Sequence, residues 1–451
     1  MKKTYGVCMA LLALGLAGVG APASHAKGRL AADDAAGGDV ATTAAASSSS
    51  SANASIPPAD VPQDQGGAAP ASAPAAATPA QAAPAPMPLP TPAMSGPLAT
   101  GIAHELPAGP FGKIEVTGVL SGIGMGGNNP TSSGDEGHAD VSNAQVFIQK
   151  TSGVFQFYLQ GGAYNLPVVG VPFTKTSIQV AGLYGPLPVA YAKLVKGNFN
   201  IEIGSLPTII GDEYTFTFEN MNIERGLLWN QEPAISRGIQ INDTYKKLTV
   251  AFSWNDGFYS DRYTSLSGLL AYAINSANTL TFAAGGNAGT YVRTGPANVI
   301  GVTPTYQNNE QVYNLIYTYT KGNLTISPYY QYTVVKSNDA VYLTPGAHTN
   351  GGAVLFNYNF KHGFSLSVRP EYIKSSGSAA TREANLLGYG PGTGAFSFTA
   401  TPTWVKDAFF VRGDVSVAHV TNFTPGAGFA FGIGGTNTNQ FRGVIEAGFL
   451  F

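Results

Sequence analysis

Apolar and polar residues alternate strictly through the C-terminal end of the chain. Between Gln440 and Phe451, one set of alternate positions is apolar or glycine and ends in phenylalanine. The other set carries Arg442 and Glu446. Successive side chains of an extended strand point to opposite faces of a sheet. The pattern therefore predicts an amphipathic β-strand with one apolar face and one charged face.

The same alternation recurs upstream in pairs of segments joined by short turns. Glycine and other turn residues separate the apolar runs at 196–198, 321–323 and 361–363, and a similar break lies at 405–407. We count about sixteen strands, and an even number puts both ends of the sheet on the same side. Their predicted starts are residues 112, 140, 154, 189, 199, 237, 248, 266, 279, 310, 324, 351, 364, 395, 408 and 438.

Short turns at one end of the strands and longer loops at the other end are typical of transmembrane β-barrels. A terminal phenylalanine that closes an amphipathic strand also resembles the C-terminal signature of bacterial outer-membrane barrels. That resemblance implies that Phe449 and Phe451 belong to an insertion signal, and that the last strand pairs with the first. We therefore expect an all-β fold, a transmembrane antiparallel β-barrel of about 16 strands with short periplasmic turns and long external loops.

The predicted inward faces of these strands are polar. A barrel of this strand number encloses water rather than a core of side chains, and water is the cheapest partner for so many polar groups. A soluble sheet with two solvated faces is the alternative, and the terminal phenylalanine and the turn asymmetry oppose it. The charged residues expected on the pore wall are Arg369, Glu371, Arg412, Asp414, Arg442 and Glu446.

Aromatic residues flank the short turns and the terminus. Two aromatic girdles at the two membrane interfaces would explain this position, whereas the general preference of aromatics for strands explains only their number. The expected girdle residues are Tyr319, Phe360, Phe364, Trp404, Phe409 and Phe451 near the turns, and Trp254, Tyr332 and Tyr372 near the long loops.

The N-terminal part of the chain has a different composition. Residues 1–26 have a basic start, an apolar run and small residues at a cleavage position, which indicates a secretory signal peptide. A retained anchor is less favoured because the apolar run is short for a span. Residues 27–108 are rich in Ala, Pro, Ser and Thr, and we expect a disordered periplasmic tether. The single cysteine, Cys8, lies in the signal peptide, so no disulfide is expected in the mature chain.

Overall composition narrows the class further. Charged residues make up 11% of the chain, well below the roughly 25% of ordinary soluble domains. The formal net charge is −2, so binding to nucleic acid has no electrostatic support. After the signal peptide no apolar run is long enough for a membrane helix, which leaves strands as the membrane-spanning elements.

One long segment, Leu206 to Ser236, is acidic and distinct from the other predicted loops. It resembles a segment shared by the OmpL-like putative β-barrel porins. The matching residues are Gly204, Thr208, Gly211, Glu213, Asn220, Asn222, Arg225, Glu232, Pro233 and Gly238. By position this segment, 206–236, is the third external loop of a barrel that spans 109–451.

The resemblance implies that this loop folds inward and narrows the lumen. Charges in a narrow passage then set ion selectivity through their local field, and Glu213 and Arg225 are the residues we expect to dominate. The same residues would pin the loop to the wall if they form ion pairs, and the two roles are compatible. The expected constriction residues are Asp212, Glu213, Glu219, Glu224, Arg225 and Arg237.

Other motifs lack the context that their chemistry needs. Gly122-x-Gly124-x-x-Gly127 leads into Asn-Asn-Pro rather than a helix, so a dinucleotide site is not expected. Asp135, Glu136 and Asp140 offer oxygen ligands for Ca²⁺, but a solvated loop is the simpler interpretation. The histidines have no metal spacing and no Gly-x-Ser-x-Gly elbow is present. We expect no enzyme activity, no catalytic residue, no metal and no cofactor.

The sequence therefore predicts a porin of a Gram-negative outer membrane, which passes small hydrophilic solutes or ions by passive diffusion. The alternative is a barrel that serves as a structural anchor or adhesin without open conductance. The expected partners are membrane lipid, the solutes, the outer-membrane assembly machinery and, by analogy with porins of this size, two further copies in a homotrimer.

Overall fold

The computed structural model describes residues 96–99, 103–130, 136–291, 304–381 and 383–451. These residues all belong to one compact unit. The predicted signal peptide and the part of the predicted tether before residue 96 lie outside the described residues, as does Asp135.

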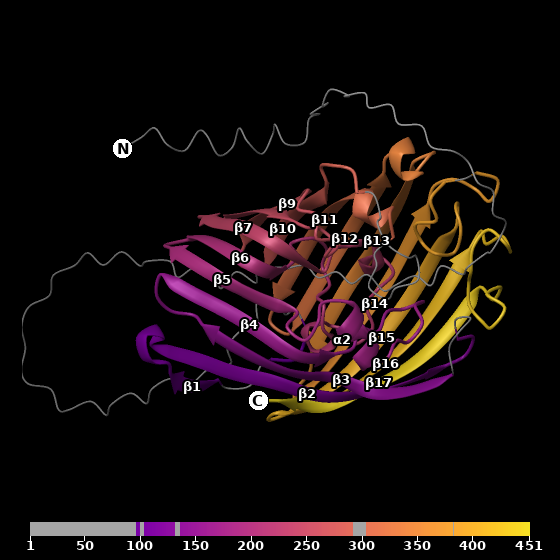
Figure 1. Cartoon of the computed structure of the whole chain (residues 1–451). Helices are drawn as coiled ribbons and strands as arrows, with labels where there is room; N and C mark the ends of the chain where they lie inside the picture. Colours follow the sequence, from indigo (N-terminus) through magenta and orange to yellow (C-terminus); the bar gives the residue numbers. More distant parts are fainter. Residues whose placement is uncertain (1–95, 100–102, 131–135, 292–303, 382) are drawn as a thin grey trace, which may run out of the picture. The chain divides into compact units, whose positions relative to one another are not determined.

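Sixteen antiparallel strands, β2 to β17, form the barrel wall, and each pairs with the next along the chain (Figure 1). β17 pairs with β2, so the sheet closes into a ring. The strands are β2 (Lys113–Gly127), β3 (Gly137–Lys150), β4 (Phe155–Tyr164), β5 (Val189–Lys196), β6 (Phe199–Pro207), β7 (Ile235–Tyr245), β8 (Leu248–Asn255), β9 (Ser265–Asn275), β10 (Asn278–Asn287), β11 (Glu310–Lys321), β12 (Leu324–Val335), β13 (Ala347–Asn359), β14 (Phe364–Ser375), β15 (Gly394–Lys406), β16 (Phe409–Thr421) and β17 (Asn439–Leu450).

The predicted fold class and strand number are confirmed. The largest difference between a predicted and an observed start is at β13, which begins at Ala347 rather than at residue 351. The four additional residues are Ala-His-Thr-Asn. They do not continue the apolar alternation from which the start of the strand was predicted.

One short strand lies outside the ring. β1 (His104–Pro107) pairs antiparallel with the first residues of β2, from His104 opposite Val116 to Pro107 opposite Lys113. The 3₁₀ turn η1 (Gly109–Phe111) connects the two strands. The remaining helical elements are α2 (Thr176–Gly182), η2 (Thr217–Glu219), η3 (Trp229–Gln231), η4 (Gln307–Asn309) and η5 (Asp339–Val341). None of the helices in the described ranges has the length and apolarity needed to cross a membrane.

The connections between the strands differ sharply at the two ends of the barrel. At one end, here called the short-turn end, the connections are the two-residue turns 197–198, 246–247, 276–277, 322–323 and 407–408 and the four-residue turns 151–154 and 360–363. At the long-loop end, the connections include loop 2 (165–188), loop 3 (208–234) and loop 4 (256–264). The predicted asymmetry of turns and loops is therefore present.

Burial follows the predicted alternation along the strands. In β17 and the residue after it, Phe441, Ile445 and Phe451 are 45%, 58% and 45% exposed, whereas Arg442 and Glu446 are 7% and 0% exposed. The aromatic residues near the short turns also meet one another on the outer face. Ring centroids lie 6.3 Å apart for Phe364 and Trp404, and 6.1 Å apart for Trp404 and Phe409. These contacts support an aromatic girdle at this end.

The C-terminal residue completes the ring. The backbone N–H of Gly118 donates to the carbonyl of Phe451 (2.5 Å), and the N–H of Phe451 donates to the carbonyl of Gly118 (3.0 Å). A Cβ atom on Gly118 would lie 2.6 Å from the Phe451 ring and 2.8 Å from the Gln145 carbonyl oxygen. The seam between the last and the first strand therefore depends on a glycine beneath the terminal ring.

We expect Gly118→Ala to weaken this seam, because one added methyl group overpacks the contact with Phe451 and such changes typically cost about 1–3 kcal/mol. Heat-modifiable mobility on gels and urea unfolding measure the folded fraction and its stability. Gly268→Ala on β9 is the matched control, since its Cβ would meet nothing closer than 3.8 Å. Equal stability of both variants would show that the seam does not depend on close packing at Gly118.

Candidate functional site

Loop 3 lies within the ring of strands. Every residue from Thr208 to Ala234 is buried except Asn230, which is partly exposed. Its contacts come from the inward-facing side chains of many strands, among them Asn143 on β3, Asn314 on β11, Gln331 on β12 and Thr349 on β13. A loop without regular structure has backbone groups that need partners once water is excluded. The inner wall supplies those partners.

Arg412 on β16 is the clearest example. Its guanidinium donates to the backbone carbonyls of Thr217, Asn220 and Met221, each at 2.8 Å. Two residues further along the strand, the carboxylate of Asp414 accepts the N–H groups of Ile223 (3.2 Å) and Glu224 (2.7 Å). One pair of wall residues thus satisfies both donors and acceptors of the loop backbone.

A second pair on β14 does the same for the next part of the loop. Arg369 forms a buried ion pair with Glu213 (2.5 Å) and donates to the Glu224 carbonyl (2.7 Å). The carboxylate of Glu371 accepts the N–H groups of Leu227 (2.7 Å) and Leu228 (3.3 Å). Glu213 in turn accepts the N–H of Gly226 at 2.9 Å. This hydrogen bond holds the two ends of residues 213–226 together.

β17 provides the third pair. Arg442 lies 3.1 Å from the Glu224 carboxylate and donates to the Val168 carbonyl of loop 2 at 2.8 Å. Glu446 accepts the hydroxyl of Thr217 (2.6 Å) and an amide hydrogen of Asn143 (3.1 Å). All six charged residues predicted for the pore wall therefore face the interior, and each contacts loop 3.

The predicted constriction residues are not all brought together. Asp212, Glu213, Glu219, Glu224 and Arg225 are buried in loop 3. Arg237 lies apart from them, on β7, where it pairs with Asp256 (2.8 Å) and Asp261 (2.7 Å) of loop 4 and covers the Tyr259 ring. By alternation Arg237 shares a strand face with the exposed Ile239 and Ile241, which is the outer face.

Burial changes the charges that the loop presents. Burial raises the pKa of Glu219 to about 8, against the opposing hydrogen bond from the Phe216 N–H. Burial lowers the pKa of Arg225 to about 10, which the nearby Glu213 opposes. At neutral pH Glu219 is therefore largely protonated and Arg225 remains charged, so the loop is less acidic than its composition indicates.

Arg225 forms its side-chain hydrogen bonds within the loop. Its guanidinium donates to the carbonyls of Thr215 (3.1 Å) and Ile223 within loop 3 itself. It also lies 5.9 Å from the centre of the Trp229 ring. Arg225 thus links two parts of the loop to each other.

Below loop 3, toward the short-turn end, two neighbouring parts of the inner wall differ. On one side, inward-facing Val119, Phe147, Tyr158, Phe410 and Leu450 form a buried cluster with loop residues Phe216 and Phe218, here called the apolar cup. On the adjoining strands β5, β6 and β7, the wall near the short turns is polar. This polar ladder comprises Lys193 and Glu202, which form an ion pair of 3.0 Å, together with Asn200, Gln240 and Asn242.

The polar ladder retains contact with water. The side chains of Lys193 and Glu202 are 29% and 12% exposed, whereas the charged wall residues around loop 3 are almost completely buried. Alternation along β6 puts Asn200 and Glu202 on one face, but it does not distinguish this wetted part of the wall from the part that the apolar cup covers.

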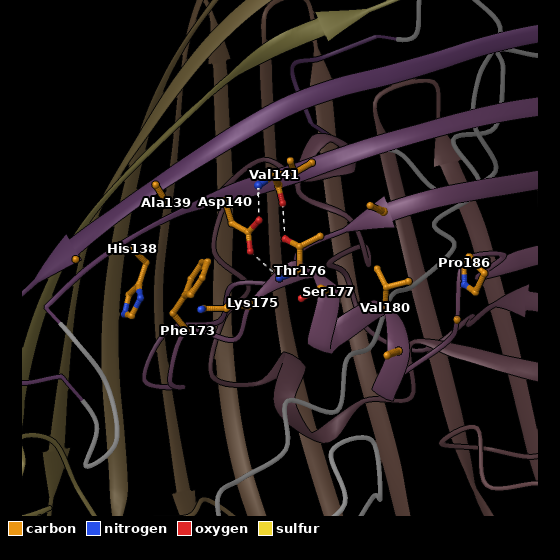
Figure 2. A pocket seen from close by; sticks show the side chains of 14 residues that line it. His138, Ala139, Asp140, Val141, Phe173, Lys175, Thr176, Ser177, Val180 and Pro186 are labelled. Atoms are coloured by element: carbon orange, nitrogen blue, oxygen red, sulfur yellow. Dashed lines mark hydrogen bonds between the residues drawn. The ribbon is translucent and has the colours of Figure 1, made fainter.

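A separate cavity of about 870 Å³ lies at the long-loop end (Figure 2). There β4 pairs with β5 only from Phe155 to Gln160, and loop 2 with α2 completes the wall. The carboxylate of Asp140 accepts the N–H groups of Val141 and Thr176, both at 2.8 Å, as Figure 2 shows. Within the described residues no group of His, Cys, Asp or Glu side chains is arranged to hold a metal ion.

Comparisons with known proteins bear on this barrel. A model of the family described as putative beta-barrel porin-2, OmpL-like, matches residues 113–451. No curated protein matches the chain. The solved structure of outer-membrane expressed OmpT of Vibrio cholerae is 11% identical and has a TM-score of 0.51, with 76% of this chain and 99% of that chain covered. In-vitro folded OmpT of Vibrio cholerae in its trimer form is 12% identical with a TM-score of 0.50, and 75% and 99% are covered. At these identities the likeness to solved structures concerns the fold.

We expect Arg412→Met to loosen loop 3 and to lower the free energy of unfolding by roughly 3–5 kcal/mol, because three buried carbonyls lose a charged donor and Glu446 loses an ion-pair partner 3.8 Å away. Denaturant unfolding followed by tryptophan fluorescence measures the change, and the buried Trp229 is one of the three tryptophans that give the signal. Lys113→Met is the control, since the Lys113–Glu105 pair is exposed and such pairs contribute little. A loss no larger than that of the control would show that Arg412 does not hold the loop.

Proposed function

Because the chain belongs to the OmpL-like family of putative beta-barrel porins and lies in the outer membrane, we propose that it is a passive diffusion channel for small hydrophilic solutes. Loop 3 would narrow this channel. Transport would follow the solute gradient without a reaction. The short-turn end would face the periplasm and the long loops the exterior, as in other barrels of this kind.

The observation that supports this proposal best is the asymmetry of the interior. Loop 3 occupies the lumen at one level, while the polar ladder on β5, β6 and β7 keeps partly exposed polar and charged groups beside it. A hydrophilic solute needs such groups to replace its hydration water in a narrow passage. We infer that solutes pass along the polar ladder rather than along the apolar cup.

We further propose that charges of loop 3 contribute to the selectivity of this passage. Glu213, Glu224 and Arg225 lie in a region from which water is largely excluded, where a charge acts over a longer distance than in bulk water. Ion pairs with the wall hold Glu213 and Glu224 in place, and hydrogen bonds within the loop hold Arg225. The same residues would therefore position the loop and shape the field.

Neutralising the two charges of the polar ladder should change ion selectivity in opposite directions. We expect Glu202→Gln to increase the relative permeability to anions and Lys193→Gln to increase that to cations, because each removes one sign of charge from the passage. Reversal potentials of single channels in planar bilayers under a salt gradient measure both effects.

The control for this experiment is the pair Glu105→Gln and Lys113→Gln, which lies on β1 and the start of β2 and is well exposed. A reversal potential that is the same in all four variants would exclude the polar ladder as the solute path. A correctly folded barrel without any conductance would instead favour the structural anchor.

We also propose that three copies associate through the outer face formed by β17, β2 and β3. This face carries glycine at 122, 124, 126 and 443, and alanine at 139, 144 and 447. Cβ atoms at Gly122, Gly126 and Gly443 would meet nothing closer than 3.7 Å, so the packing of the chain itself does not demand glycine there. Small residues allow another barrel wall to approach closely, and in-vitro folded OmpT of Vibrio cholerae has a trimer form.

We expect Gly122→Trp to shift purified protein from trimer to monomer, because the indole would hold a neighbouring wall away from this face. Leu315→Trp is the control, since Leu315 is a half-exposed residue on the outer side of β11. Light scattering coupled to size-exclusion chromatography in detergent measures the mass of each variant. An unchanged trimer in Gly122→Trp would place the interface elsewhere.

A further inference from the structure

A piece of the predicted tether lies inside the barrel. The N–H of Gly96 donates to the backbone carbonyl of Glu219 in loop 3 at 3.1 Å. Two residues later, Leu98 is 3% exposed and belongs to the buried cluster of the apolar cup. The segment Gly96–Ala99 therefore makes both a backbone and a side-chain contact with the interior.

Gly96 shows how closely this segment approaches loop 3. A Cβ atom at this position would lie 2.2 Å from the carbonyl oxygen of Asn220 and 2.6 Å from its carbonyl carbon. Those atoms belong to the backbone, and the Asn220 carbonyl is already held by Arg412 at 2.8 Å, so they cannot move aside cheaply. Only glycine allows the two backbones to meet in this way.

The apolar cup matches the side chain that it receives. Its wall members come from β2, β3, β4, β16 and β17, and Phe218 of loop 3 stacks on Phe147 with ring centroids 5.4 Å apart. In a water-filled lumen such a surface would stay exposed at a cost in free energy. Leu98 is an apolar residue in a segment otherwise dominated by alanine, proline and small polar residues, and it is the residue that the cup buries.

The next strand, β1, lies at the short-turn end. β1 begins at His104 and pairs with the first residues of β2, and Leu106 in β1 is 48% exposed. Leu98 is thus buried with the interior cluster, whereas β1 is exposed.

We propose that Gly96–Ala99 is an internal plug, which binds the underside of loop 3 through Gly96 and the apolar cup through Leu98. The plug fills the part of the lumen next to the polar ladder and thereby sets the width of the passage. Its effect on conductance rests on the porin function proposed above, whereas its position does not.

Thiol labelling tests the position of the plug without any transport measurement. Cys8 is the single cysteine and lies in the predicted signal peptide, so Leu98→Cys and Leu106→Cys each introduce one thiol into the mature chain. We expect a water-soluble maleimide to label Leu98→Cys much more slowly than Leu106→Cys in the folded, full-length protein. Adding Gly96→Val to Leu98→Cys should restore fast labelling, because the valine cannot fit against Asn220.

Single-channel recording tests the effect of the plug on width. Gly96→Val and Leu98→Asp should each raise conductance above that of the unmodified chain, and Leu106→Asp, the matched control on β1, should leave it unchanged. Equal labelling rates at positions 98 and 106 would overturn the plug. Protected labelling at position 98 with unchanged conductance in both plug variants would overturn its role in setting the width.

A protein that is silent in every variant, but shows slow labelling at position 98, would refute the porin function and support the plug's position. The two proposals therefore fail in distinguishable ways.

Discussion

The structure depends on one constraint, which is that every backbone polar group in a closed barrel must find a partner without help from lipid. The strands meet it by pairing with their neighbours around the ring, with Phe451 and Gly118 at the seam. Loop 3 cannot meet it in this way, because it crosses the interior without regular structure. Arginine and carboxylate side chains on β14, β16 and β17 bind its carbonyl and N–H groups instead.

This arrangement gives the buried charges a structural reason. Burying an ion pair costs desolvation, and an apolar substitute is often as stable. An apolar wall, however, would leave the loop backbone unpaired, and each orphaned group would cost about as much as a lost hydrogen bond. A charged side chain is therefore favoured at a wall position where the loop backbone needs several donors from one residue. Arg412, which donates to three loop carbonyls, is such a position. The wetted polar ladder carries charges under a different constraint, since water already satisfies part of their hydrogen bonding.

Much of the fold could be predicted because its signal is local. Alternation with a period of two defines both faces of a strand such as β17, and turn residues define its ends. The face of the six charged wall residues followed from the same alternation. The same alternation puts Arg237 on the outer face with Ile239. Arg237 was nevertheless predicted as a constriction residue, because it follows the acidic loop directly in sequence. Partners such as Arg412 and Thr217 could not be predicted, because side chains that meet across the lumen have no fixed spacing in sequence. The same is true of Leu98, which composition alone assigned to the tether.

The distance in sequence between loop 3 and its partners has a consequence for how the protein matures. Thr217 and Arg412 are 195 residues apart, and Thr217 and Glu446 are 229 residues apart. Contacts between such distant residues form late, since the long intervening chain must be brought together first. During biogenesis the loop has no wall to bind until the final hairpins are in place. The order of synthesis therefore makes the interior the last region to acquire its native arrangement, and an arrested, partly inserted chain would be recognisable by a loop that proteases can still cut.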